Sequence, residues 1–446
     1  MQIIQSFQNI FKIPELRNRL LWTFGLLIVF RLGSHVPLPG VNPDAIAAWR
    51  EEMDRAGESI FHLVQVFSGG SIGNLAIFSL GIMPYITASI IMQLMTKVSP
   101  NLEAIAKEGP SGQRKIQAYT RYAAVPVCLV QGFFAAKQLA VFSAAQLEQN
   151  RMQLLLSHSF GNMLFIMLGL TAGSLFIMWL GEQITDRGVG NGASMLIMAG
   201  IVARMPAIIG DMFKGARDGL HSMETVLFIL ALYVAAIVAV VFVTQAQRRI
   251  PLQHAKHIRG RRMMAGGRNF LPIRVNTAGV MPVIFASSLM IVPQLLGLIP
   301  GLGWLKESID RGGFFFTLLY VTMIFFFSYF WTYLFMRPQE ISLQLKEAGS
   351  FVPGIRPGEN TSEYLNSILS RITLCGAAFL CVISLLPDLT SNALGLQRYL
   401  VQFLGGTGIL IVVGVALDVI NKIESHLVMH HYGTFLGGST RVQGRR

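Results

Sequence analysis

Residues 81–89 read Gly81-Ile82-Met83-Pro84-Tyr85-Ile86-Thr87-Ala88-Ser89, and the pattern returns as Gly279-Val280-Met281-Pro282-Val283-Ile284-Phe285-Ala286-Ser287. The copies share Gly, Met, Pro, Ile, Ala and Ser, and each opens a long apolar segment. These segments are the second and the seventh along the chain, and an odd separation reverses the direction in which the second copy crosses a membrane. The repeat therefore indicates two halves of inverted topology that share a pathway at the bilayer midplane. Chance recurrence of Gly-x-x-Pro is disfavoured, because the copies occupy equivalent places in the order of segments.

The composition predicts a helical membrane protein with many spans. Of the 446 residues, 52% are hydrophobic and 13% are charged, whereas soluble domains carry about 25% charge. Apolar segments of about 18–24 residues are long enough to cross the hydrocarbon core. We expect ten spans, near residues 20–38, 75–96, 119–141, 160–181, 192–210, 224–244, 276–299, 314–336, 370–387 and 399–419. The expected fold is all-α, with ten transmembrane helices in two inverted five-helix halves around a central pore.

The basic residues predict the orientation of the chain. With the N-terminus inside, the cytoplasmic segments hold 25 of the 36 Lys and Arg residues, as the positive-inside rule requires. Both termini are therefore expected in the cytoplasm. The expected parts are a cytoplasmic segment 1–19, an N-terminal half 20–210, a C-terminal half 211–420 and a cytoplasmic tail 421–446.

Two predicted cytoplasmic loops carry further information. Residues 245–275 contain eight Lys and Arg and no acidic residue. This loop either rests on anionic lipid or docks on RNA phosphate or an acidic protein. In the loop 337–371, Arg356 stands in the stretch Phe351-Val352-Pro353-Gly354-Ile355-Arg356-Pro357-Gly358. Two prolines and two glycines would fix a turn and present that side chain to a partner.

The longest outer loop, residues 38–74, contains an apolar stretch that is too short to span. Residues 60–67 have helical spacing and break at Ser68-Gly69-Gly70. Eight residues make about 12 Å of helix. The stretch either lies on the membrane surface or re-enters the protein, which is permitted where it is buried or lines a water-filled cavity. We favour re-entry, because the stretch leads directly into the first copy of the repeat.

The sequence offers little catalytic chemistry. It has no Gly-Lys dipeptide, hence no Walker A loop, and it lacks the H-E-x-x-H motif. Cys128, Cys375 and Cys381 lie in apolar spans without metal-ligand spacing. Apart from Asp418 near a helix end, the spans are almost free of acidic residues, whereas coupled transporters place ionisable groups at the midplane. We expect no enzyme activity, no cofactor and no metal site.

Aliphatic side chains occupy the centre of the predicted spans. Ile82 and Ile86 lie one turn apart on a single helix face, and Ile284 is the repeat-equivalent of Ile86. If the repeat axis passes between these spans, the isoleucines converge into a constriction that closes by dewetting. The alternative is that they pack against neighbouring helices or lipid.

The chain closely resembles the SecY family, the channel subunits of the bacterial Sec protein translocon, over essentially all 446 residues. The resemblance rests on Ser68-Gly69-Gly70, the stretch 81–86, Gly181-Glu182-Gln183-Ile184-Thr185-Asp186-Arg187-Gly188-Val189-Gly190-Asn191-Gly192, Gly260-Arg261-Arg262, the stretch 351–358, and Gly405-Gly406-Thr407. It implies a channel that translocates unfolded secretory polypeptides across the cytoplasmic (inner) membrane. It also implies a lateral gate between spans 2 and 3 and spans 7 and 8, which releases transmembrane segments into lipid.

The resemblance also assigns roles to residues. The implied pore ring is Ile82, Ile86, Ala193, Ile197, Ile284 and Ile411, in which Ala193 replaces a bulkier aliphatic residue. The implied plug, roughly residues 61–74, includes Phe61, Leu63, Val64, Val66, Phe67, Ser68, Gly69 and Gly70. The best-matched positions for docking the ribosome and the SecA motor ATPase are Lys256, Arg261, Arg262 and Arg356. Further implied partners are the SecE and SecG subunits, signal sequences, the unfolded polypeptide and membrane lipids.

Polar residues on the expected gate spans suggest a weak latch. Gln93, Gln131 and Asn276 are polar side chains at apolar or interfacial depth. Such groups seek partners across helices, or they bond within their own helix.

The runner-up function is a secondary solute transporter with inverted repeats, and the shortage of polar groups at the midplane disfavours it. A membrane-embedded hydrolase is third, because no nucleophile–base pair or metal motif is present.

Overall fold

The computed structural model describes residues 13–46, 49, 68–148, 154–157, 159–219, 222–254, 258–259, 262–263, 268–290, 313–394 and 406–437. Its elements divide between two compact units, residues Met1–Gly210 with Val415–Arg446 and residues Asp211–Gly414.

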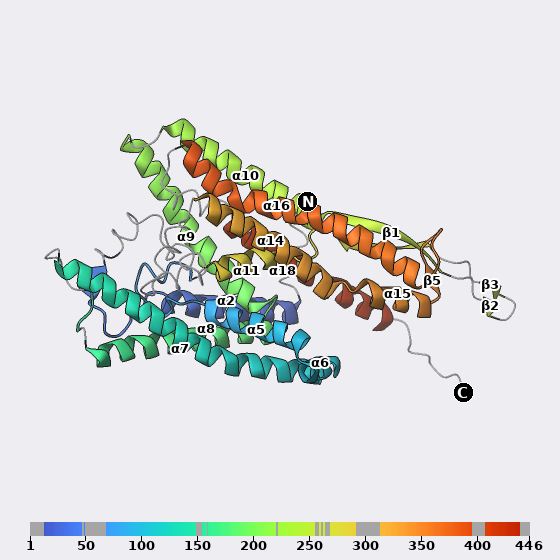
Figure 1. Cartoon of the computed structure of the whole chain (residues 1–446), viewed down its shortest axis with the longest axis horizontal. Helices are drawn as coiled ribbons and strands as arrows, with labels where there is room; N and C mark the ends of the chain where they lie inside the picture. Colours follow the sequence, from blue (N-terminus) through green and yellow to red (C-terminus); the bar gives the residue numbers. More distant parts are fainter. Residues whose placement is uncertain are drawn as a thin grey trace. The chain divides into compact units, whose positions relative to one another are not determined.

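The first unit is built from long helices. They are α2 (Pro14–Gly33), α5 (Met83–Val98), α6 (Pro100–Lys107), α7 (Pro110–Glu148), α8 (Phe160–Arg187), α9 (Gly192–Arg217, to residue 210) and α18 (Thr407–Gly437, from residue 415), with a short 3-10 helix, η1 (Pro43–Ala45). Helix α7 packs against α5, α6 and α8, and α2 packs against α8 (Figure 1). A buried cluster that includes Leu38, Trp49, Leu75 and Leu170 joins the loops to the helices.

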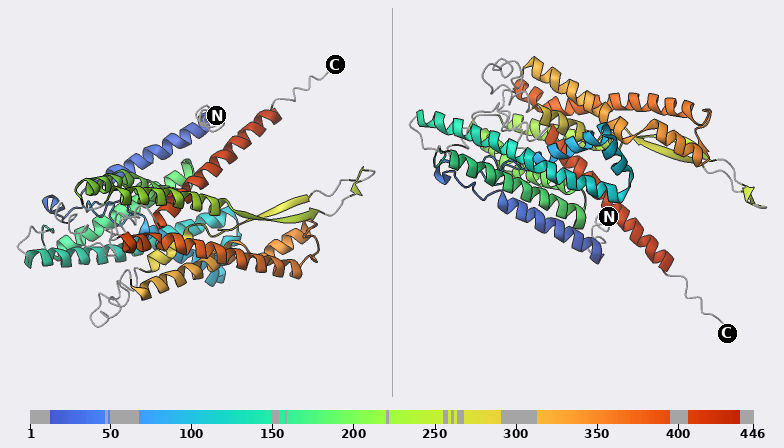
Figure 2. Two further views of the ribbon diagram at one scale, coloured as in Figure 1. Left: turned by 90° about the horizontal axis from the view of Figure 1, so that it is seen from above. Right: turned by 60° about the horizontal axis from the view of Figure 1, so that its bottom comes forward.

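The second unit combines helices with a small sheet. Its helices are α10 (Met223–Gln245), α11 (Met281–Leu289), α14 (Phe314–Phe335), α15 (Pro338–Glu347) and α16 (Glu359–Leu394), and its strands are β1 (Gln247–His254), β2 (Ile258–Arg259), β3 (Arg262–Met263), β4 (Arg268–Arg274) and β5 (Ser350–Phe351). Strands β4, β1 and β5 form one antiparallel sheet in that order. The long β1–β4 hairpin runs beside the first turns of α16 (Figure 2). The described chain is mostly helical, as predicted, and the strands of this loop are a feature that the sequence analysis did not foresee.

Six helices in the described part of the chain are long and apolar enough to span a membrane. They are Pro110–Val141, Phe160–Arg187, Gly192–Arg217, Met223–Gln245, Phe314–Glu347 and Glu359–Ser391. The chain is therefore a multi-pass membrane protein. The predicted spans 119–141, 160–181, 192–210, 224–244, 314–336 and 370–387 all lie on these helices.

The start of the second predicted span is wrong by eight residues. Residues 75–82 form turns apart from Ala76, which is bridged to Pro37, and α5 begins at Met83. Leu75 (φ 44°) and Gly81 (φ 59°) both adopt left-handed backbone conformations, which an α-helix excludes. Pro84 in the first turn of α5 then favours helix initiation there. Composition shows the apolar run but does not show where within it the helix begins.

The two copies of the repeat have the same backbone. Gly81 and Gly279 are left-handed at φ 59° and 63°. Ile82 and Val280 follow as N-cap residues with φ −90° each, and both helices then begin with Met-Pro. Glycine is needed at the first position, because L-residues rarely adopt such a φ. The sequence repeat is thus a repeat of local structure.

Candidate functional site

The two predicted cytoplasmic loops fold together. The β1–β4 hairpin comes from the first loop and β5 from the second, and they pair at Gln253–Phe351 and His254–Ser350. Beneath this sheet lies a buried apolar cluster of Ile250, Leu252, Ile273, Val352, Leu365 and Leu369. We call this assembly of β1, β4, β5, the 352–358 turn and the start of α16 the loop module. Sequence reasoning treated the two loops as separate.

The loop module holds Arg356 in a fixed turn with an exposed side chain. Gly354 (φ 83°) and Gly358 (φ 109°) are left-handed on either side of it. Val352 and Ile355 pack into the buried cluster, and the Thr361 hydroxyl donates to the Arg356 carbonyl at 2.9 Å. The backbone of Arg356 is therefore anchored while its guanidinium faces solvent. The turn and the exposed side chain are as the sequence predicts, and contact of Arg356 with a partner stays a prediction.

The other predicted docking residues are only partly covered by the structure. Arg262 lies in β3, which pairs with β2 at Arg259, while Lys256 and Arg261 lie outside the described residues. The hairpin does expose Arg248, Arg249 and Arg274. The described part of the loop thus presents a basic surface.

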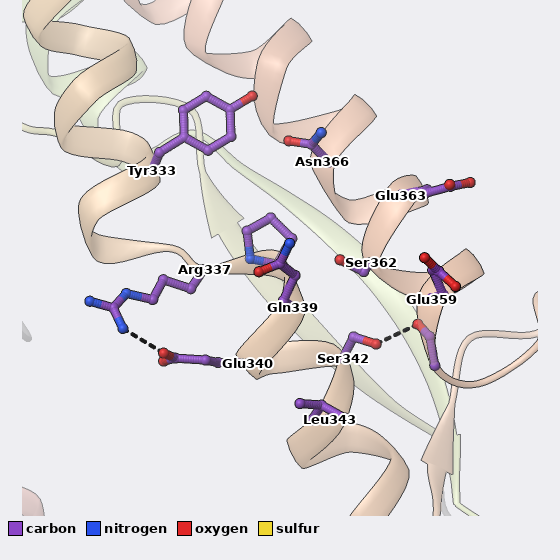
Figure 3. A pocket seen from close by; sticks show the side chains of 12 residues that line it. Tyr333, Arg337, Gln339, Glu340, Ser342, Leu343, Glu359, Ser362, Glu363 and Asn366 are labelled. Atoms are coloured by element: carbon purple, nitrogen blue, oxygen red, sulfur yellow. Dashed lines mark hydrogen bonds and ion pairs between the residues drawn. The ribbon is translucent and has the colours of Figure 1, made fainter.

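A pocket of about 840 Å³ lies beside this module, where α14, α15 and α16 meet (Figure 3). Its walls include Tyr333, Arg337, Glu340, Glu359 and Glu363. Arg337 Nη1 is paired with Glu340 Oε1 at 2.5 Å. The buried Ser342 hydroxyl donates to the Gly358 carbonyl at 2.5 Å. This bond ties α15 to the end of the Arg356 turn.

Four proposed ring residues belong to the first unit. Ile82, Ile86 and Ile197 are buried, and Ala193 is half-buried. Gly181 of α8 lies against Ile82: a Cβ at Gly181 would be 3.5 Å from Ile82 Cδ1 and 3.5 Å from the Ala193 nitrogen. Gly181 is thus in ordinary van der Waals range of both the residue that precedes α5 and the start of α9. Ile82 and Ala193 both lie beside this glycine.

The other two ring residues belong to the second unit. Ile284 on α11 and Ile411 on α18 are both buried. A Cβ at Gly414 would lie 2.9 Å from Val280 Cγ2. Gly414 follows Ile411 by three positions and Val280 precedes Ile284 by four, which is one helical turn each. The contact therefore joins the two helices near their ring residues.

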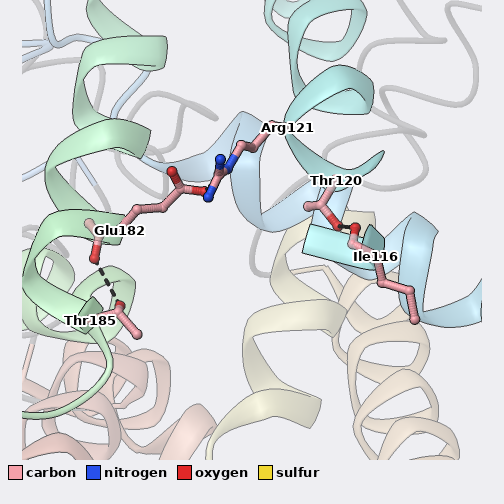
Figure 4. Close-up of polar contacts among 6 residues, drawn as sticks. Ile116, Thr120, Arg121, Glu182 and Thr185 are labelled. Atoms are coloured by element: carbon pink, nitrogen blue, oxygen red, sulfur yellow. Dashed lines mark hydrogen bonds and ion pairs between the residues drawn. The ribbon is translucent and has the colours of Figure 1, made fainter. Parts of the chain in front are cut away.

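The stretch from Gly181 to Gly192 builds the α8–α9 junction, and Figure 4 shows Glu182 and Thr185 of this stretch. The Thr185 hydroxyl donates to the Gly181 carbonyl and accepts from the Gly192 N–H, each at 2.9 Å. A Cβ at Gly192 would collide with the Gly181 carbonyl oxygen. The glycines of this stretch thus allow close backbone packing. In the sequence analysis they served only to support the family resemblance.

An ion pair crosses from α7 to α8 beside this junction. Arg121 Nε lies 2.5 Å from Glu182 Oε1, and Figure 4 shows the two side chains pointing toward each other. Glu182 is 18% exposed and Arg121 is 48% exposed. No sequence signal indicated the pair, because its members are 61 residues apart.

The described part of the proposed plug is its final turn. Ser68 and Ser71 are fully buried. The Ser71 hydroxyl donates to the Ser68 carbonyl at 2.8 Å, and the Ser79 hydroxyl donates to the Ser71 carbonyl at 3.1 Å. These bonds make a compact turn. The other proposed plug residues, Phe61, Leu63, Val64, Val66 and Phe67, lie outside the described residues.

The three proposed gate residues have different surroundings. The Gln93 amide donates to the Ser89 hydroxyl at 3.2 Å, within its own helix. Gln131 on α7 is half-buried. Asn276 is buried, and a Cβ at Gly376 of α16 would lie 3.8 Å from its Cα. The bond within α5 is the alternative that the sequence left open for Gln93.

The fold and these residues define a class, that of multi-pass helical membrane proteins with an aliphatic interior and folded basic loops. The SecY family model matches residues 76–420. Two relatives described as protein translocase subunit SecY support this match. The Thermotoga maritima relative is 40% identical, over 99% of this chain and 100% of its own length. The Pseudomonas aeruginosa relative is 43% identical, over 95% and 94%. The chain belongs to the SecY family, which confirms the resemblance.

Solved structures agree on the fold. One described as a protein-conducting channel is similar with a TM-score of 0.62 at 16% identity, over 92% of this chain and 93% of its own. Sec61 from a canine ribosome–channel complex gives a TM-score of 0.57 at 16% identity, over 92% and 93%. At such identities the likeness establishes the fold alone.

Proposed function

We propose that this chain forms the protein-conducting channel of a Sec translocase. It passes unfolded secretory polypeptides across the membrane and releases transmembrane segments laterally into lipid. Membership of the SecY family supports this function. It also agrees with the prediction that the chain is not an enzyme. The observation in the structure that carries the proposal is the repeat, whose two copies start two helices in the same way and place Ile86 and Ile284 at equivalent positions.

The proposed channel has two inverted five-helix halves, residues 20–210 and 211–420, around a central pore. Its ring is Ile82, Ile86, Ala193, Ile197, Ile284 and Ile411. Apolar side chains offer a passing polypeptide no fixed hydrogen bonds, so diverse sequences can slide through. The same side chains exclude water when the pore is empty. The segment 61–74 serves as the plug.

The proposed location is the bacterial cytoplasmic membrane, with both termini in the cytoplasm. The loop module then faces the cytoplasm and docks the ribosome and the SecA motor through Arg356 and the basic hairpin. A related channel has been solved in a ribosome complex. SecE and SecG are the proposed partner subunits. The exposed arginines of β1 and β4 suit RNA phosphate or an acidic protein surface.

The ring is tested by making it polar. Replacing Ile86 and Ile284 with Asn should hydrate the constriction and raise the resting ion conductance in planar bilayers. The matched control replaces Leu318, which is 51% exposed on α14, with Asn and should leave conductance unchanged. Unchanged conductance in the ring variant, with the plug segment also deleted, would remove the ring from the mechanism.

A further inference from the structure

The turn Ser68–Gly70 meets α9 backbone to backbone. A Cβ at Gly69 would lie 2.7 Å from the Gly200 Cα, and a Cβ at Gly200 would lie 2.7 Å from the Gly69 Cα. Real Cβ atoms essentially never approach so closely. Because both neighbours are backbone atoms, no side-chain rotation can relieve the collision. Position 200 therefore accepts only glycine while the turn stays in place.

A second contact lies one helical turn further along α9. A Cβ at Gly70 would lie 2.8 Å from Arg204 Cδ and 3.0 Å from its Nε. The stem of Arg204 therefore lies against Gly70. Gly69 (φ 63°) and Gly70 (φ 89°) are both left-handed, which favours glycine. Two successive glycines thus meet two α9 residues that lie on one helix face.

The same face of α9 carries two proposed ring residues. Positions 193, 197, 200 and 204 are separated by four, three and four residues, which is the spacing of one helix face. At a rise of about 1.5 Å per residue, Gly200 is about 4.5 Å from Ile197 along the axis. The turn therefore rests directly beyond the ring position on α9. The hydroxyls of Ser71 and Ser79 tie this turn to the residues that follow it.

We propose that Gly200 and Arg204 form a seat on α9 that holds the Ser68–Gly70 turn and thereby maintains the closed state of the channel. Both are positioning residues: Gly200 admits the turn by its lack of a side chain, and Arg204 covers Gly70. The proposal rests on the proposed channel function, because only a channel has a closed state to hold. In this proposal the stability of the closed state depends on residues of α9 as well as on the plug segment.

The test adds one methyl group to the seat. Gly200→Ala is reconstituted as the full chain with its proposed partner subunits in planar bilayers. The methyl must displace the turn, so we expect the resting conductance to rise several-fold. Gly210→Ala is the matched control, because it makes the same change in α9 where no atom lies within 4 Å. This control should keep wild-type conductance, and both variants should assemble with similar melting temperatures.

A second variant approaches the same contact from the turn. Gly69→Ala leaves α9 unchanged and should also raise conductance, so it decides the matter if Gly200→Ala fails to assemble. In the double variant the increases should not multiply, because both changes break one contact. Wild-type conductance in every seat variant that assembles would overturn the seat. An equal rise in Gly210→Ala would overturn it as well.

Conductance measurements in the same bilayers distinguish a failure of the seat proposal from a failure of the proposed channel function. If the variant with Asn at positions 86 and 284 conducts while the seat variants stay closed, the seat proposal is wrong and the proposed channel function stands. If an arrested translocating polypeptide opens no conductance in the wild-type protein, the proposed channel function itself fails.

Discussion

Arg121 and Glu182 show how one ion pair joins two helices of the first unit. The carboxylate is mostly buried and the guanidinium is about half exposed. A buried charge that loses its partner costs more than an exposed one, because water can solvate only the latter. The two ends of the pair are therefore unequal. The exposure of Arg121 also lets solvent screen the attraction, which limits the coupling to about 0.5–1 kcal/mol.

We predict that Arg121→Gln destabilises the protein more than Glu182→Gln does, because it leaves the buried carboxylate without its partner. The double variant should resemble Glu182→Gln. Thermal unfolding of the purified protein in detergent measures the three changes. Lys107→Gln, which breaks an exposed pair with Glu103, is the control and should change little. An equal decrease in melting temperature for Arg121→Gln and Glu182→Gln would contradict this prediction.

Among the elements, the loop module combines segments that lie far apart in the sequence. Ile250 and Leu252 of β1, and Leu271 and Ile273 of β4, point to one face at strand spacing. This alternation was a sequence signal for two strands, and the high charge of the segment obscured it. The pairing of β1 with β5 could not be predicted, because about a hundred residues separate them and only tertiary packing brings them together.

We predict that Arg356→Glu impairs motor-driven translocation while the protein still inserts and assembles. The turn is fixed by Gly354, Gly358 and the buried Val352, so the reversed charge changes the presented side chain and leaves the fold intact. Lys346→Glu makes the same charge change on exposed α15, outside the turn, and should have a weaker effect. Translocation of a secretory precursor into proteoliposomes measures both. A normal rate for Arg356→Glu would disprove the presented arginine.

For the whole molecule, the proposed lateral gate predicts a minimum hydrophobicity that a signal sequence needs in order to enter the channel. Replacing Gln93, Gln131 and Asn276 together with Leu should shift the balance between closed and open channels. Polar bonds between membrane helices contribute about 0.6 kcal/mol on average, so the shift should be modest. Translocation of precursors whose signal sequences differ stepwise in hydrophobicity measures this threshold. Because Gln93 bonds within α5, Gln93→Leu alone should have the smallest effect. An unchanged threshold in the triple variant would mean that packing alone sets the gate.

Sequence reasoning predicted the long apolar helices well and the ends of several elements poorly. The runs that become α8, α10 and α14 are continuous, so hydropathy alone places them. It failed at residues 75–82, where left-handed backbone at Leu75 and Gly81 delays the helix. For the candidate site the repeat indicated Ile82, Ile86 and Ile284, whereas Ile197 and Ile411 were proposed only from the resemblance. It could not find Gly200, because a glycine in an apolar helix has no distinctive signal until its neighbour is known.

Helix α16 has a mechanical consequence. Its 36 residues extend about 54 Å, whereas the hydrocarbon core is about 30 Å thick. The excess length carries Leu365 and Leu369, which lie in the buried core of the loop module. The helix starts three residues after Arg356 and contains no proline before Pro387. We therefore expect a displacement of the Arg356 turn to tilt the whole helix up to Pro387, because proline is the residue at which an α-helix most readily bends.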